Sequence, residues 1–273
     1  MISPTTQPED PLPELRINLT SGAKVERRDS DAWHLEIPAG QPGSYRLAQL
    51  DDYRNLPRNG FPWRPPLRLQ LRARASDHLI PGTWGFGLWN DPFSFRLGFG
   101  GGQRIPALPS TAWFFFASPP NYLSLRDDLP AQGNLVSTFR SEPIPSWLLA
   151  LGSVCLPLLA MPQLARFLRR IARRFVWQSA SSISVNTTDW HSYAINWEAE
   201  CAQFFLDGQS LLETPVSPGG PLGLVIWIDN QYMALPSSGR FRFGTLENPN
   251  PAWIEIEQLR ISSEVSHHHE LDG

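Results

Sequence analysis

The sequence is poor in lysine, cysteine and charge. Lys24 is the one lysine among 273 residues, so arginine carries nearly all of the positive charge. A formal net charge of −3 exerts no overall attraction on nucleic acid, and we expect no nucleic-acid partner. Cys155 and Cys201 have neither the spacing of a disulfide framework nor that of a zinc site. Charged residues make up 18% of the chain, which is low but compatible with a globular protein.

The first residues also lack the apolar core of a secretory signal. Residues 1–13 are rich in proline, threonine and acid, and we interpret them as a flexible arm. Together with the scarcity of cysteine, this favours a cytoplasmic protein, with peripheral attachment to a membrane as a further option. Residues 263–273 contain three consecutive histidines and are expected to form a disordered tail.

Proline, glycine and aromatic residues are abundant instead, with 27 Pro, 20 Gly, 11 Trp and 15 Phe. Helices tolerate proline poorly, because it lacks an amide donor and clashes with the preceding turn. Short strands joined by turns accommodate it, which predicts a β-sandwich. Alternation of apolar and polar residues is clearest at 67–74. Strand-like patterns lie at residues 15–19, 33–37, 45–53, 67–74, 84–89, 112–117, 135–139, 183–185, 190–197, 202–206, 222–228, 240–243 and 253–261.

Two stretches in the first half are rich in glycine. In residues 82–89 glycine alternates with large aromatic residues, a pattern that indicates close approach of another backbone or a ligand. Residues 98–102 form a glycine-rich loop, but the Gly-Lys-Ser/Thr ending of a phosphate-binding loop is missing and no helix follows. We therefore expect no nucleotide-phosphate site there.

Residues 143–178 interrupt the β pattern. Residues 147–161 are fifteen mostly apolar residues. As a helix rising about 1.5 Å per residue they would reach roughly 22 Å, short of the ~30 Å hydrocarbon core of a bilayer. Residues 162–176 then form an amphipathic pattern with arginine on one face. We expect a helical hairpin inserted into one β domain of residues 14–262.

Three roles are open for the hairpin. It could pack on the sandwich with its arginines in water, it could dock a scaffold subunit onto a membrane-protein partner, or it could lie in the surface of an anionic membrane. In the last case each basic residue contributes about 1 kcal/mol. The residues expected to meet the membrane are Trp147, Leu148, Leu149, Arg166, Phe167, Arg169, Arg170, Arg173 and Arg174.

Three parts of the chain match motifs of one enzyme family. Residues 190–197 (WHSYAINW) and 204–209 (FFLDGQ) are similar to its FHTYAIEW and WYVDGK segments. Residues 82–89 (GTWGFGLW) look like its GTWPAFWML strand, and residues 256–261 (IEQLRI) like its closing VDYVRVY strand. The family resembled is glycoside hydrolase family 16, of the concanavalin A-like lectin/glucanase superfamily. The resemblance implies an all-β, concanavalin A-like jelly-roll β-sandwich, here with an inserted α-helical hairpin.

The same family needs a Glu-x-Asp-x-Glu motif on the strand after GTWPAFW, where alternation brings the carboxylates onto one concave face. The corresponding strand here, residues 111–118, contains no carboxylate. The resemblance therefore implies a jelly roll that has lost glycosidase chemistry. Glu257 matches a position whose acid helps to bind structural calcium in some relatives, so calcium is the one cofactor that the resemblance suggests.

The leading hypothesis is a pseudoenzyme that binds a ligand in an aromatic groove on the concave face. Aromatic faces stack on sugar rings and also accept lipophilic surfaces, so the expected partner is a glycan, a glycolipid or another lipophilic small molecule. The alternative is an enzyme acting on such a molecule, with Asp91 or His191 moving a proton in an apolar pocket. The residues expected to contact the ligand are Trp84, Trp89, Asn90, Asp91, Trp113, Phe115 and Tyr122.

Overall fold

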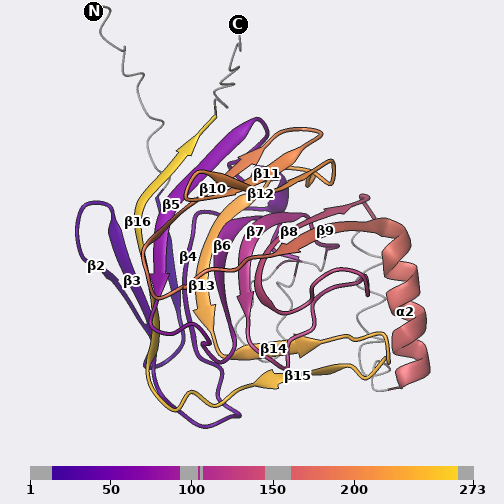
Figure 1. The fold of residues 1–273 in the computed structure, drawn as a ribbon, viewed down its shortest axis with the longest axis horizontal. Helices are drawn as coiled ribbons and strands as arrows, with labels where there is room; N and C mark the ends of the chain where they lie inside the picture. The colour runs from indigo at the N-terminus through magenta and orange to yellow at the C-terminus, as the bar shows by residue number, and fades with distance from the viewer. Residues whose placement is uncertain (1–13, 93–103, 105–106, 145–160, 264–273) are drawn as a thin grey trace, which may run out of the picture.

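The computed structural model describes residues 14–92, 104, 107–144 and 161–263 (Figure 1). In these residues the strands form two seven-stranded antiparallel sheets and one two-stranded sheet. Sheet A has the order β1-β4-β13-β6-β7-β8-β9, and sheet B the order β12-β11-β10-β5-β16-β3-β2. The protein is an all-β jelly-roll sandwich, and the predicted fold class is confirmed.

The bounds of the elements follow the sequence pattern closely. The strands of sheet A are β1 (Arg16–Leu19), β4 (Leu47–Asp51), β6 (Thr83–Trp89), β7 (Thr111–Ala117), β8 (Gly133–Ser141), β9 (Val176–Ser182) and β13 (Gly223–Asp229). Those of sheet B are β2 (Lys24–Arg27), β3 (Ala32–Ile37), β5 (Leu67–Ala75), β10 (His191–Trp197), β11 (Ala202–Leu206), β12 (Gln209–Thr214) and β16 (Ala252–Ser262). The remaining elements are β14 (Gln231–Ala234), β15 (Arg242–Thr245), the helix α2 (Pro162–Phe175) and the short 3-10 helix η1 (Arg58–Gly60).

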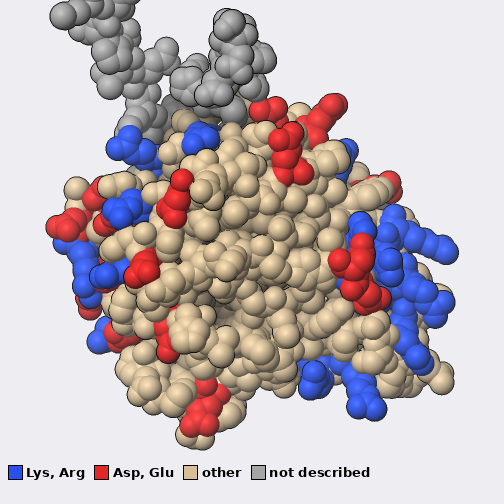
Figure 2. Space-filling model, in the orientation of Figure 1, with Lys and Arg blue, Asp and Glu red and all other residues tan. Residues whose placement is uncertain are grey.

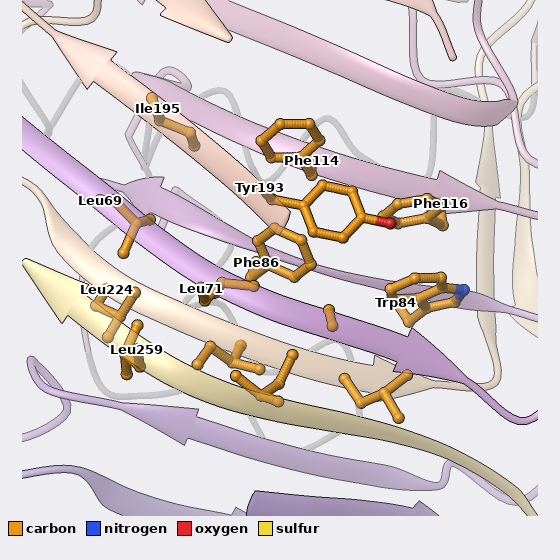
Figure 3. Packing of buried hydrophobic residues seen from close by; sticks show 14 of the residues in the cluster. Leu69, Leu71, Trp84, Phe86, Phe114, Phe116, Tyr193, Ile195, Leu224 and Leu259 are labelled. Atoms are coloured by element: carbon orange, nitrogen blue, oxygen red, sulfur yellow. The ribbon is translucent and has the colours of Figure 1, made fainter. Parts of the chain in front are cut away.

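The inner faces of the two sheets share one hydrophobic core (Figure 3). The rings of Trp84 on β6 and Phe116 on β7 stack in parallel, with centroids 3.7 Å apart. Tyr193 on β10 meets Phe114 edge to face at 4.9 Å, which joins sheet B to sheet A. Aromatic residues of this size supply much of the free energy of a core, because each buries a large apolar area.

Glycine alternates with aromatic residues in β6 because rings and backbone of the neighbouring strands cross it. A Cβ added to Gly87 would lie 2.4 Å from the carbonyl oxygen of Ala112 and 2.6 Å from the Cβ of Trp113. A Cβ added to Gly85 would lie 2.9 Å from the ring of Trp227. The close approach that the glycine pattern indicates is therefore made by the protein itself.

The predicted insertion is longer than the observed one. β9 is a strand of sheet A that pairs with β8, so the break in the sheet ends at residue 175 rather than 178. The same strand takes the place of the one expected at 183–185. Helix α2 is the basic half of the predicted hairpin, whereas residues 145–160, with Trp147, Leu148 and Leu149, lie outside the described residues. Within the described part of the chain, no helix is long and apolar enough to cross a bilayer.

We expect Gly87→Ala to lower the free energy of unfolding by about 1–3 kcal/mol, because the added methyl group overpacks the contact with β7. Urea denaturation followed by tryptophan fluorescence measures the change. Gly219→Ala is the matched control, since a Cβ there would meet only Ser110 Oγ, at 4.0 Å. Equal stability of the two variants would contradict the packing described for β6.

Candidate functional site

The face of sheet A turned away from sheet B, its outer face, is lined by aromatic rings. Trp113 lies 5.6 Å from Trp227 and 5.0 Å from Phe115, measured between ring centroids. Trp89 lies parallel to Trp227 at 6.5 Å. The rings of Trp113, Phe115, Phe139 and Trp227 stay 6–8% exposed, against 0–3% for the aromatic rings between the sheets. We call Trp89, Trp113, Phe115, Phe139 and Trp227 the outer aromatic cluster.

No carboxylate stands on β7, the strand for which the sequence resemblance predicted the place of catalytic acids. Asp51 and Asp229, which the sequence analysis missed, do point to the outer face, since they alternate in phase with Leu47 and Trp227. Asp51 pairs with Val225, four residues before Asp229 on β13. At about 3.3 Å per residue, the backbone positions of Asp51 and Asp229 are therefore roughly 13 Å apart along the strand direction. Retaining and inverting glycosidases need carboxyl groups about 5–5.5 Å and about 6.5–9.5 Å apart.

Asp229 is held by three donors at one end of the cluster. The hydroxyl of Thr83 donates to it at 2.8 Å, that of Tyr45 at 3.3 Å and the N–H of Gln231 at 3.2 Å. Burial nevertheless raises the pKa of Asp229 to about 7. The indole N–H of Trp227 donates to the same Thr83 hydroxyl at 2.9 Å, so this network fixes the ring.

Asp91, the predicted proton-transfer residue, belongs to a clamp between loops. Its Oδ2 accepts a hydrogen bond from Arg104 Nη1 at 2.5 Å, and Arg104 also donates to the carbonyls of Tyr53 and Leu56 at 2.7 Å. Burial, and to a smaller extent the charge of Asp91, raises the pKa of Asp51. With 8% of Asp91 and 1% of Asp51 exposed, both carboxylates serve the loops around them.

Of the predicted ligand residues, Trp89, Trp113 and Phe115 lie together in the outer aromatic cluster. The prediction for Trp84 is wrong, because its ring is buried in the core between the sheets. Asn90 donates to the carbonyl of Leu108 at 2.8 Å and holds a loop in place. Tyr122 lies away from the cluster, with its hydroxyl donating to Asp127 at 3.3 Å.

His191 and Glu257 lie on sheet B rather than near the aromatic cluster. His191 Nδ1 is 2.7 Å from Asp207 Oδ2, and Nε2 is 3.1 Å from the carbonyl oxygen of Asn186. Glu257 forms an ion pair with Arg72. Among the described residues, no group of three His, Cys, Asp or Glu side chains could hold a metal ion. Calcium binding by Glu257 stays a prediction, although the guanidinium of Arg72 already pairs with this carboxylate.

Helix α2 turns its apolar side to the sandwich, where Leu164 and Leu168 are half-buried. Arg169 was predicted to point outward with the other arginines, and this is wrong. It is 5% exposed and donates to both carboxylate oxygens of Asp127, at 2.8 and 3.2 Å. The hydrogen bonds from Arg169 lower the pKa of Asp127. The exposed arginines gather on one side of the molecule, where Figure 1 places α2 (Figure 2): Arg166, Arg170, Arg173 and Arg174.

No protein family matches the sequence, and no curated protein does. Solved structures of family 16 jelly rolls and of a lectin domain are similar to it in fold. A glycoside hydrolase family 16 endo-glucanase from Bacteroides ovatus is 8% identical, with a TM-score of 0.47 over 89% of this chain and 86% of that chain. The carbohydrate recognition domain of Emp47p is 10% identical, with a TM-score of 0.46 over 92% and 89%. A pseudo β-1,3-glucanase of Mycobacterium tuberculosis is 12% identical, with a TM-score of 0.43 over 86% and 75%.

Asp229 predicts a pH-dependent stability. The unfolded carboxyl titrates near pH 4, at about 3.9, and the folded one at about 7. The folded protein binds this proton more tightly, so the stabilisation is full below about pH 4 and is lost as the pH rises to about 7.

We expect Asp229→Asn to flatten this decline, by up to the order of 1 kcal/mol per pH unit. Burial also raises the pKa of Asp52 to about 7. Part of the decline in stability with pH will therefore remain in the Asp229→Asn variant. Urea denaturation across this pH range measures the slope, with the exposed Asp31→Asn as control. An unchanged slope in Asp229→Asn would show that the carboxyl is ionised in the folded state.

Proposed function

We propose that the protein is a non-hydrolytic jelly roll that binds a glycan or glycolipid against the outer aromatic cluster. The observation that supports this best is on the outer face of β7. Trp113 and Phe115 occupy the positions where, by the sequence resemblance, a hydrolase would carry its catalytic acids. Trp89 is the half-buried ring of the cluster, and such a ring can accept the apolar face of a sugar ring or an acyl chain, while few polar groups are needed for orientation.

The acids around the cluster argue against glycoside hydrolysis. Asp51 and Asp229 lie in rows roughly 13 Å apart, too far for either geometry of the reaction. Asp91 accepts a hydrogen bond from Arg104 within the clamp between loops, so its carboxylate is already engaged there. A ligand held here would be bound without being cleaved.

We further propose that α2 brings the protein to an anionic membrane surface from the cytoplasm. Arg166, Arg170 and Arg174 are exposed, and no carboxylate pairs with them in the part of the chain that the structure describes. Phe167 beside them is 50% exposed. Since the other apolar side chains of α2 face the sandwich, the attraction would be mainly electrostatic, at about 1 kcal/mol per arginine.

The binding proposal is tested with β-glucan oligosaccharides and a glycolipid. We expect no release of reducing sugar, and a change in tryptophan fluorescence as a ligand binds. Trp89→Ala should weaken binding at least about tenfold, the equivalent of about 1.4 kcal/mol. Trp177→Ala, which removes a ring that is 45% exposed on β9, is the control and should bind as the wild type does. Hydrolysis that Asp51→Asn or Asp91→Asn abolishes would overturn the proposal.

The membrane proposal is tested by flotation with vesicles of phosphatidylserine and phosphatidylcholine, and with phosphatidylcholine alone. We expect flotation with the anionic vesicles that weakens as salt is added. Replacing Arg166, Arg170 and Arg174 together by Gln should lower the affinity about 100-fold or more. The control replaces three exposed arginines that lie away from α2 in the same way, Arg16, Arg54 and Arg64. Equal loss in both triple variants, or no flotation of the wild type, would contradict it.

A further inference from the structure

A polar groove of about 1050 Å³ lies on the outer face of sheet B, the opposite side of the sandwich from the aromatic cluster. The groove runs over β10, whose outward residues are Ser192, Ala194 and Asn196. Ala194 pairs with Gln70 on β5 and with Phe205 on β11, both much larger side chains. The hollow therefore follows from side-chain size along three neighbouring strands.

A ladder of hydrogen bonds crosses four strands at one end of the groove. Arg68 Nη1 donates to Asn196 Oδ1 at 2.6 Å, and Asn196 Nδ2 donates to Gln203 Oε1 at 3.3 Å. Gln203 Nε2 in turn donates to Glu213 Oε2 at 3.2 Å. Each of these side chains is held in one orientation by its neighbour, so little conformational entropy is lost when a ligand binds to them.

A β-bulge in β16 adds polar side chains to the same groove. Glu257 pairs with Arg72 and Arg260 with Gln70, which leaves an extra residue in β16. Gln258 adopts a left-handed φ of 53°, which residues other than glycine rarely do. Bulges often re-aim side chains beside functional sites, and here both Gln258 and Arg260 line the groove.

Arg68 places a positive charge in this groove. Its side chain is half-buried, and its guanidinium lies 5.9 Å from the ring centroid of Phe205. In the described residues, no carboxylate lies within ion-pair distance of it. A partly desolvated charge without a counter-ion is unfavourable, so an anion bound beside it would gain free energy. Glu198 and Glu213 also line the groove, which disfavours a long polyanion such as a nucleic acid.

We propose that the groove binds an acidic saccharide, in which a sugar ring carries a carboxylate. The ring of Phe205 offers an apolar face to the sugar, and Gln70 and Gln203 also line the groove. Arg68 binds the carboxylate, whose two oxygens fit the fork of a guanidinium. This site is separate from the aromatic cluster and does not depend on the function proposed for that cluster.

The test is calorimetric titration with cellobiouronic acid, a short oligosaccharide with a single carboxylate, and, in parallel, with its neutral counterpart cellobiose. We expect the acidic oligosaccharide to bind at least about tenfold more tightly. Arg68→Gln should weaken binding of the acidic oligosaccharide at least about tenfold. Arg140→Gln removes the same charge from β8 on sheet A and should leave the affinity unchanged.

A second variant keeps every charge and fills the hollow instead. The side chain of Ala194 points away from the core, so Ala194→Leu should fold, as thermal unfolding can check, and should abolish binding. Trp89→Ala should bind the acidic oligosaccharide as the wild type does. Unchanged binding by Ala194→Leu or by Arg68→Gln, or an equal loss in Arg140→Gln, would overturn the proposal.

Discussion

Sheet A is buried on both faces, and the placement of polar groups in the protein follows from that burial. On its inner face, Trp84 and Phe114 pack in the core between the sheets. On its outer face, Trp113 and Trp227 belong to a second cluster. Ionisable groups in the middle of such a sheet would lose their hydration without compensation. Acids are therefore found towards the ends of its strands, each with donors of its own, and the charged side chains of sheet B face away from the sandwich.

Much of the fold could be predicted from the sequence. In strands with one solvent-exposed face, such as β5, apolar and polar residues alternate clearly. Residues 112–117 form the unbroken apolar run that is typical of a strand buried on both faces. β9 was missed because it follows α2 without a break and consists largely of small residues. β12 was also missed, although Asp207 and Gly208 with φ of 49° and 80° form a two-residue hairpin turn that the Asp-Gly pair signals.

The site was predicted less well, for two reasons. Trp84 and Trp89 stand five positions apart in one strand, so alternation places their side chains on opposite faces and only Trp89 can join the outer aromatic cluster. The error for Arg169 has a different cause. Its partner Asp127 lies 42 residues earlier, and helical periodicity carries no information about that contact. The groove on sheet B depends likewise on strand register, which brings Arg68, Asn196 and Gln203 into one row.

Helix α2 leads directly into β9, the last strand of sheet A, and contacts it (Figure 1). The last strand of a sheet carries unpaired backbone groups that can recruit a strand from another chain. With its arginines on the free side, the helix places bulk and like charge beside this edge, so two copies meeting edge to edge would repel one another. The charge of α2 therefore opposes edge-to-edge pairing of two copies at β9.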